Sequence, residues 1–198
     1  MKVQPIRDIE TVKEIERILA SDASRKGHCK YLLFECGIYL ARRVCDILPM
    51  RVSDLLEYDE NGKVRAKTSI AIKERKTRKI MYLPIPDHLQ RFAKRELKHL
   101  PMDAYVFESR QKDSRRQARP ISYKTAYNYM KEIAVMMEMP YNVATHTLRK
   151  TFGYHYYQRT KDIATLMVLY NHFSEKDTKI YIGIEMDELT KAVQHFRY

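Results

Sequence analysis

The chain of 198 residues is long enough for one domain of ordinary size, and its 44% hydrophobic and 31% charged residues exclude a wholly disordered protein. With 37 Lys and Arg against 25 Asp and Glu, the net charge of +12 indicates a polyanionic partner, either nucleic acid or an acidic membrane surface. Five Gly and seven Pro exclude collagen-like and low-complexity classes.

The sequence indicates no membrane segment. The first residues, MKVQPIRDIETV, lack the apolar run of a signal peptide, and the most apolar stretch, 31–44, is interrupted by Glu35, Arg42 and Arg43. The three cysteines form no CxxC pair, which favours reduced core thiols over a disulfide framework or a zinc site. We therefore expect a soluble, cytoplasmic protein without a membrane partner, associated with the nucleoid of a prokaryote or with a phage.

Hydrophobic periodicity and capping residues predict a mostly helical chain. In chain order the predicted helices are 9–19, 30–40, two short ones within 43–56, 86–99, 122–139, 145–159, 163–170 and 187–195. Pro49 is the reason for dividing 43–56 into two helices. The Asn61-Gly62 turn and the alternating apolar residues after it predict one small antiparallel sheet over about 64–85. The predicted fold class is mainly α with a small antiparallel β-sheet (α+β).

His146 and Arg149, in the helix predicted over 145–159, are three positions apart and therefore share a helix face. This pair suits a phosphodiester, because the arginine can bind non-bridging oxygens through two donors while the histidine relays a proton. The alternative is an ordinary solvated helix face.

Other polar residues also have two interpretations. Arg43 either serves a site or forms an ion pair with Asp46, one turn away. Lys76, in the charged run KERKTRK, is either solvated or reaches a DNA backbone. His172 can be a capping or core histidine. Tyr181 is one of 15 tyrosines, and periodicity alone does not distinguish it from the others.

These residues lie in motifs that follow one another in a definite order: ARRVCDILPMRVSDL, RKTRKIMYLPIP, HTLRK and YNHFSEKDTKIYIG. Together the motifs resemble those of the tyrosine recombinases, also called the phage integrase family, over about residues 43–183. The resemblance implies the integrase catalytic-domain fold, and it implies six catalytic residues, which are Arg43, Lys76, His146, Arg149, His172 and Tyr181.

The first motif departs from the family pattern. The family usually has Gly-Leu or Gly-Arg before the first arginine, whereas this chain has Ala41-Arg42. A second register, MRVSDLL, would make Arg51 the first arginine instead. We prefer Arg43, because its register leaves residues 50–55 to fill the continuation that the family shows next.

The resemblance implies an activity and its chemistry. Tyr181 would attack a DNA phosphodiester, which gives a 3′-phosphotyrosyl intermediate and a free 5′-hydroxyl, and strand exchange would follow. The two arginines and His172 would hold the non-bridging oxygens, His146 would take the phenolic proton, and Lys76 would protonate the leaving oxygen. No metal or cofactor is required, and the sequence offers no carboxylate cluster or Cys/His spacing for a metal.

The implied partner is double-stranded DNA, which is bound mainly through its phosphates. The stretch 109–120, SRQKDSRRQARP, has no apolar periodicity and is expected to be an exposed loop. The candidate DNA-binding residues are Arg75, Arg78, Lys79, Arg110, Lys112, Arg115, Arg116, Arg119 and Lys124. The alternatives are a merely solvated basic loop and, for the start of the 122–139 helix, packing instead of a groove contact.

Family members commonly carry a separate N-terminal core-binding domain, for which the roughly forty residues before Arg43 are too few. We expect residues 1–198 to be a single catalytic domain, either a fragment or a short natural form. In the family the C-terminal helix often docks on a neighbouring protomer, and Leu189, Val193 and Phe196 give the helix predicted here an apolar stripe. Docking within the same chain is the alternative. We expect a monomer in solution that assembles on DNA.

Rival functions share part of this evidence. A type IB topoisomerase would use similar chemistry to nick and reclose DNA, but the small size and the nine-residue spacing between His172 and Tyr181 favour a recombinase. A non-catalytic DNA-binding regulator with an integrase fold is a second rival, although all six catalytic positions are filled. An RNA-binding module has only the positive charge in its favour.

Overall fold

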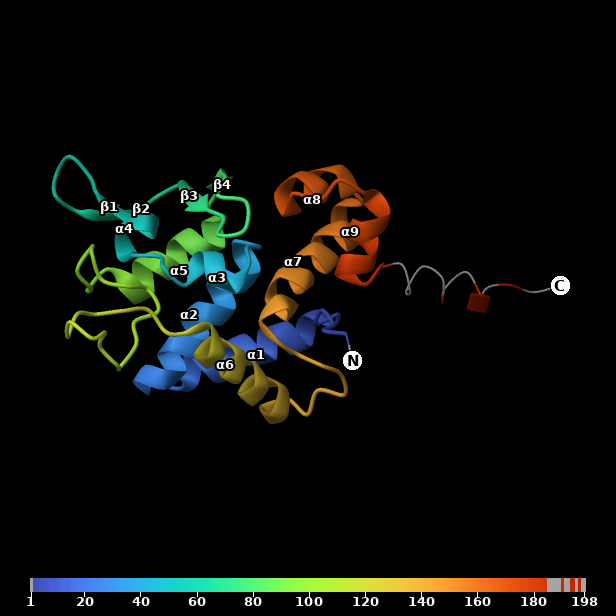
Figure 1. Ribbon diagram of the computed structural model, residues 1–198, viewed down its shortest axis with the longest axis horizontal. Helices are drawn as coiled ribbons and strands as arrows, with labels where there is room; N and C mark the ends of the chain where they lie inside the picture. Colours follow the sequence, from blue (N-terminus) through green and yellow to red (C-terminus); the bar gives the residue numbers. More distant parts are fainter. Residues whose placement is uncertain (1, 185–189, 191–192, 195, 197–198) are drawn as a thin grey trace.

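The computed structural model describes residues 2–184, 190, 193–194 and 196 (Figure 1). Its helices and strands are α1 (Ile9–Ser21), α2 (Arg25–Tyr39), α3 (Val44–Ile47), α4 (Val52–Leu55), β1 (Leu56–Tyr58), β2 (Val64–Ala66), β3 (Ser69–Lys73), β4 (Ile80–Pro84), α5 (Asp87–Leu97), α6 (Tyr123–Met136), α7 (Thr145–Thr160), α8 (Ile163–Tyr170) and α9 (Glu175–Ile182). The helix predicted over 187–195, with Leu189 of its apolar stripe, lies outside the continuous described range.

The predicted fold class is confirmed, but the prediction of one sheet is wrong. The described residues form two separate antiparallel pairs, β1 with β2 and β3 with β4. The Asn61-Gly62 turn connects the first pair, and Gly62 has a φ of 73°, which glycine adopts without strain. Strand β1 was missed because it has three residues, too few for a recognisable alternation.

Local sequence signals explain where α2 begins and why α3 and α4 are separate helices. Helix α2 begins at Arg25, before the predicted position 30, because Ser24 Oγ accepts a hydrogen bond from the backbone N–H of Gly27 at 3.0 Å. Pro49 lies between α3 and α4, as predicted. The sequence did not predict α9.

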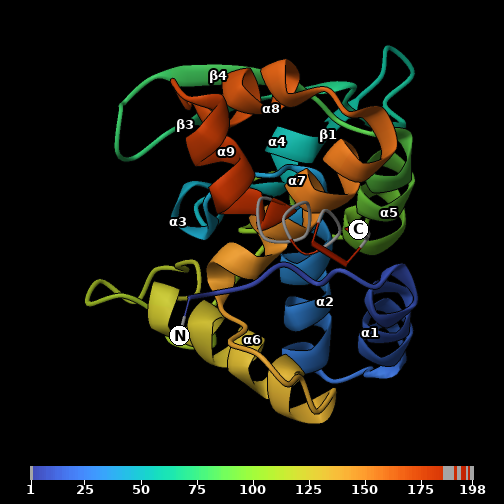
Figure 2. The same ribbon diagram turned by 90° about the vertical axis from the view of Figure 1, so that its right-hand side faces the viewer.

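Helix α7 connects two parts of the molecule (Figures 1 and 2). The main core is formed by helices α1 to α6 and the strands, whereas α8 and α9 pack on α7 around a second apolar cluster that includes Tyr157, Tyr170 and Ile182. Gly153 permits this approach, because an added Cβ would lie 2.5 Å from Tyr170 Oη and 2.7 Å from Ile182 Cγ2. The close packing fixes the position of α9 relative to α7.

Two acidic residues lie where α1 packs against α2, the half-buried Glu16 on α1 and the buried Glu35 on α2. Glu35 is 1% exposed, and its Oε2 lies 2.9 Å from His88 Nε2 on α5. Burial raises the pKa of Glu35 to about 7, and burial together with the charge of Glu35 raises the pKa of Glu16 to about 7.

This pair predicts a pH-dependent stability. A carboxyl whose folded pKa is raised stabilises the fold fully below its unfolded pKa, and the contribution is lost as pH rises through about 7. In Glu35→Gln, we expect the fall in the free energy of unfolding between pH 5 and pH 8 to be about 2 kcal/mol smaller than in wild type. Urea unfolding across this pH range measures the free energy of unfolding of both proteins. Parallel pH profiles for wild type and Glu35→Gln would contradict the prediction.

Candidate active site

Five of the six residues implied by the resemblance meet where α7, α8 and α9 face the start of α3. Arg43 is the N-cap of α3, and His146 and Arg149 lie in the first turns of α7. His172 follows the left-handed C-cap of α8, and Tyr181 lies near the end of α9. The chain reaches Arg43 through Ala41 at a φ of 52°, a conformation that suits the glycine usual in the family.

Tyr181 is half-buried among rings and cations. Its Oη lies 3.2 Å from His146 Nδ1, and its ring centroid is 5.2 Å from that of His172. Burial raises the pKa of Tyr181, while the charge of Arg149 opposes this rise. The phenol is therefore protonated at neutral pH and needs a base before it can attack, and His146 is within hydrogen-bonding distance to serve as one.

Arg149 is 2% exposed, and its side chain is only partly satisfied. Its Nη2 donates to the Tyr170 carbonyl at 3.0 Å, and the guanidinium carbon lies 4.3 Å from the centroid of the Tyr170 ring. Within the described part of the chain, Nε and Nη1 have no hydrogen-bond partner. Buried donors without a partner are costly, so these two are suited to receive oxygens of an anionic ligand beside Tyr181.

A buried carboxylate organises the arginines on the other side. Glu74 Oε1 lies 3.4 Å from Arg43 Nη1 and 3.5 Å from Arg42 Nη1. Arg42 also donates to the Leu169 carbonyl, and burial together with the charge of Arg149 lowers its pKa to about 10. Glu74 thus joins the two adjacent arginines to the β3–β4 connection.

The sequence reasoning missed the roles of Arg42 and Glu74, although a signal for them was present. Arg42 interrupts an apolar stretch, and Glu74 is the single acidic residue in the run 73–79. A charge embedded in apolar sequence needs an opposite charge when it is buried. The alternative first arginine, Arg51, lies elsewhere: it is exposed, and its guanidinium stacks on Tyr105 at 4.3 Å from the ring centroid.

The two histidines are suited to different tasks. Burial, with the charges of Arg149 and Lys150, lowers the pKa of His146, which favours a neutral imidazole able to accept a proton. Burial and Arg149 also lower the pKa of His172, whose Nδ1 lies 3.2 Å from Thr178 Oγ1 on α9. That contact fixes the imidazole of His172 next to the Tyr181 ring.

Lys76 is not brought into this cluster. It is exposed in the turn between β3 and β4, a turn closed by the hydrogen bond from Arg78 N to the Glu74 carbonyl at 2.9 Å. Because Glu74 at the base of this turn contacts Arg42 and Arg43, Lys76 stands on an element anchored at the site.

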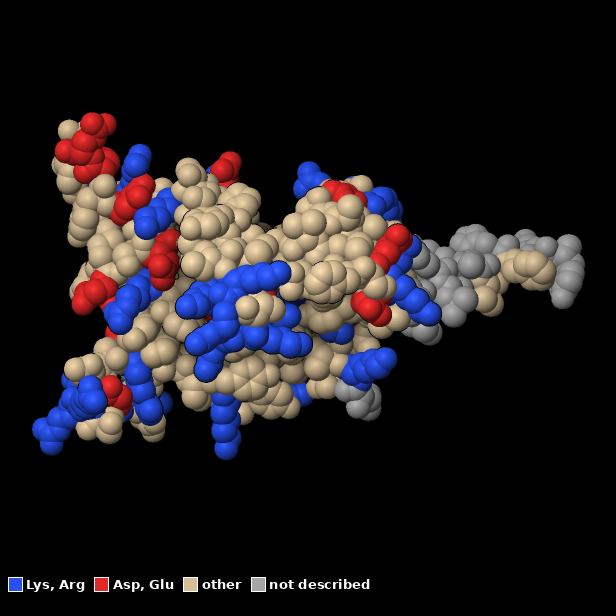
Figure 3. All heavy atoms as spheres, turned by 45° about the horizontal axis from the view of Figure 1, so that its top comes forward, with Lys and Arg blue, Asp and Glu red and all other residues tan. Residues whose placement is uncertain are grey.

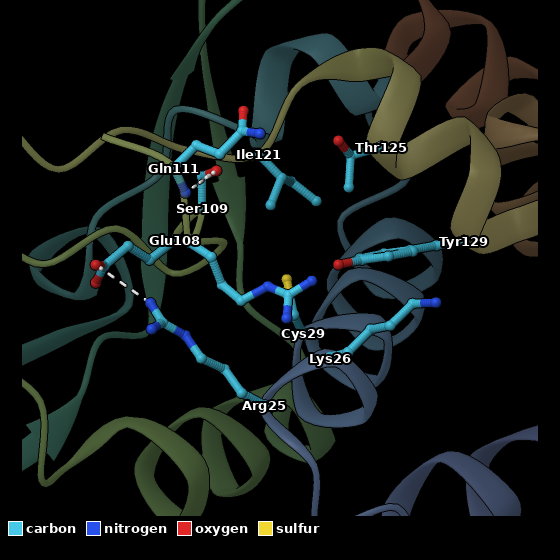
Figure 4. Close-up of a pocket in the computed structure, with 10 residues that line it drawn as sticks. Arg25, Lys26, Cys29, Glu108, Ser109, Gln111, Ile121, Thr125 and Tyr129 are labelled. Atoms are coloured by element: carbon cyan, nitrogen blue, oxygen red, sulfur yellow. Dashed lines mark hydrogen bonds and ion pairs between the residues drawn. The ribbon is translucent and has the colours of Figure 1, made fainter. Parts of the chain in front are cut away.

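Basic residues gather on the face that contains this turn (Figure 3). All nine candidate DNA-binding residues are exposed, including Lys124 in the first turn of α6. Arg110 is one of the residues that line a pocket. This pocket lies between the start of α2, the segment that carries Glu108, and α6 (Figure 4). In that pocket Arg25 Nη2 lies 3.4 Å from Glu108 Oε1, so Glu108 neutralises part of the positive charge of the pocket.

Neither a metal site nor a membrane-spanning helix is present among the described residues. Within 2–184 and the few described residues beyond it, no group of three or more His, Cys, Asp or Glu is arranged to hold a metal ion. Over the same residues, every helix is too short or too polar to span a lipid bilayer.

Comparisons with known proteins identify the family of this chain. The chain matches the phage integrase family over residues 10–188. It is 38% identical over 194 residues to the probable integrase/recombinase YoeC of Bacillus subtilis (strain 168), and the aligned residues cover 98% of this chain and 97% of YoeC. It is 27% identical to the tyrosine recombinase XerA of Pyrococcus furiosus, over 93% of this chain but 59% of XerA.

Solved structures share the fold. The crystal structure of XerA recombinase matches 100% of this chain and 65% of that protein, with a TM-score of 0.64 and 18% identity. The catalytic domain of bacteriophage HP1 integrase matches 98% of this chain and 95% of its own length, with a TM-score of 0.59 and 17% identity. The chain therefore spans less than two thirds of XerA but nearly all of the HP1 catalytic domain.

Family membership and sequence similarity together define a DNA breaking–rejoining enzyme. The chain belongs to the phage integrase family, the tyrosine recombinases.

Proposed function

We propose that this protein is a site-specific DNA recombinase or integrase that forms a covalent intermediate through Tyr181. The observation that carries the proposal is the buried guanidinium of Arg149, which holds two unpartnered donors beside the Tyr181 ring. An anionic phosphodiester can satisfy those donors, and its phosphorus would then lie within reach of the phenolic oxygen.

In the proposed step, the bond between Tyr181 Oη and phosphorus forms while the bond from phosphorus to the 5′ oxygen breaks. His146 accepts the phenolic proton, and Lys76 gives a proton to the leaving 5′ oxygen after the β3–β4 turn closes on DNA. Arg43, Arg149 and His172 stabilise the negative charge that develops on the non-bridging oxygens. One phosphoester replaces another, so attack by the 5′-hydroxyl of a second strand completes the exchange without a metal or cofactor.

The proposed substrate is double-stranded DNA, held by the exposed basic residues of the β3–β4 turn and of the 109–120 loop. XerH recombinase has been crystallised bound to its difH substrate, and lambda integrase as a tetramer bound to a Holliday junction. By analogy, we propose that this chain is a monomer in solution, assembles into oligomers on DNA and works on DNA in the cytoplasm.

A pool of nicked duplexes with randomised sequence around the nick tests the function. We expect wild type to form an SDS-stable adduct in the presence of EDTA, with a free 5′-hydroxyl on the departing strand. Selected duplexes should then support strand transfer to a second duplex. Relaxation of supercoils without strand transfer would favour the topoisomerase alternative, and the absence of any adduct across the pool would overturn the proposal.

A further inference from the structure

Lys150 lies beside the proposed nucleophile, and the mechanism above does not use it. It follows Arg149 in α7 and is half-buried, with its Nζ 4.9 Å from the centroid of the Tyr181 ring. The same Nζ donates a hydrogen bond to the Val3 carbonyl at 2.9 Å. An ammonium group at this distance from an aromatic ring attracts the ring electrons, and it attracts a phenolate more strongly still.

The N-terminal segment fixes this ammonium group in place. Segment 3–7 contacts α7 and the residues just before it: the Gln4 N–H donates to the Asn142 carbonyl at 3.0 Å, and the Ile6 N–H donates to Thr151 Oγ1 on α7 at 2.9 Å. Arg7 Nη2 then donates to the Gly183 carbonyl, just beyond α9, at 3.4 Å. The segment therefore contacts both the helix that carries Lys150 and the end of the helix that carries Tyr181.

Lys150 differs from the arginines in what becomes of its charge. When a phosphodiester binds, its negative charge offsets the charges of Arg43 and Arg149, which then support the phenolate less. Lys150 donates its hydrogen bond to the Val3 carbonyl, which is neutral, so the positive charge of Lys150 is not offset there and stays available to Tyr181. Lys150 is half-buried, so its ammonium group is partly removed from water, and this burial lowers its pKa. Electrostatic interactions are stronger in such a less polar environment than in water.

We propose that Lys150 is a positioning residue for Tyr181, whose ammonium group, anchored on the Val3 carbonyl, orients the ring and favours its phenolate form. The proposal rests on Tyr181 being the nucleophile.

A titration of the free protein tests the electrostatic effect without DNA. With 3-fluorotyrosine incorporated in place of Tyr181, fluorine NMR follows the ionisation of this one ring in the full chain. We expect Lys150→Met to raise its pKa by about one unit relative to wild type. Lys150→Gln, which can still donate to the Val3 carbonyl but has no charge, should give a similar rise, whereas Lys150→Arg should give little change.

Lys161→Met is the matched control, because Lys161 Nζ lies over another tyrosine ring, 5.3 Å from the Tyr157 centroid. This variant should leave the titration at position 181 unchanged. An unaltered pKa in both neutral variants of Lys150, with folding verified by thermal melting, would overturn the proposal. If Lys150→Met does not fold, Lys150→Gln alone decides the question, because it retains a polar hydrogen-bond donor at this position.

The rate of adduct formation on a selected nicked duplex gives a second measurement. We expect both neutral variants to form the adduct about tenfold more slowly at pH 7, with their pH–rate profiles displaced to higher pH. Lys150→Arg should regain most of the wild-type rate. If wild type forms no adduct, the proposed function fails while the titration still tests Lys150. If wild type reacts and the neutral variants match it at every pH, the inference about Lys150 fails alone.

Discussion

Tyr181→Phe is expected to abolish the covalent adduct on nicked duplexes while leaving DNA binding close to that of wild type. The substitution removes only the phenolic oxygen, which lies 3.2 Å from His146 Nδ1. The phenylalanine ring can keep the contacts with His172 and Tyr170 and the cation above it, so the packing of α9 on α7 should survive. Without an oxygen to attack phosphorus, no phosphotyrosyl bond can form.

The matched control is Tyr156→Phe on α7, which removes a hydroxyl that donates to Asp162 Oδ2 at 3.4 Å. This variant should form the adduct at the wild-type rate. Gel-shift titration and SDS gels on the same duplexes measure binding and the adduct separately. An adduct that persists in Tyr181→Phe would transfer the nucleophilic role to another residue.

Local patterns were sufficient for the part of the site that lies on α7. The helix predicted over 145–159 matches Thr145–Thr160, and the three-residue spacing correctly places His146 and Arg149 on one face. The sequence could not show the environment of that face. The partners of Arg149 include the Tyr170 carbonyl, a group that any residue at that position would supply.

Helix α9 shows why the nucleophile could not be selected from periodicity. Glu175–Ile182 is short and polar, and its buried residues are Thr178 and Ile182. Ser174 does accept a hydrogen bond from the backbone N–H of Asp177, so an N-cap signal was present but stood before no apolar run. The position of Tyr181 came instead from its spacing after His172, a property of the family resemblance.

The convergence of Arg43, Arg149 and Tyr181 depends on long-range packing that no local pattern encodes. Gly153 allows α8 and α9 to approach α7, and Glu74 gathers two arginines from a distant segment. Because each contact joins segments far apart in the chain, only an ordered set of motifs could point to it. Lys76 shows the limit of that approach, since its motif is present while its side chain stands away from the cluster.

Arg149→Lys should slow adduct formation by about 10²–10³-fold even though it conserves the positive charge. The guanidinium presents Nε and Nη1 as unpartnered donors in one plane while Nη2 donates to the Tyr170 carbonyl. A lysine ammonium is a single point of charge on a flexible side chain, and it cannot donate to the phosphodiester oxygens and to the Tyr170 carbonyl at once. Arg159→Lys, the same change in the exposed last turn of α7, is the control and should react like wild type.

Chemical rescue separates a missing guanidinium from a disturbed fold. In Arg149→Ala, added guanidinium at millimolar concentration can occupy the vacated space beside the Tyr170 ring and supply planar donors to the phosphodiester. We expect it to restore part of the cleavage rate, whereas ammonium should restore much less. Single-turnover cleavage of a selected nicked duplex measures both variants, and a wild-type rate in Arg149→Lys would mean that phosphate recognition at this position requires charge alone.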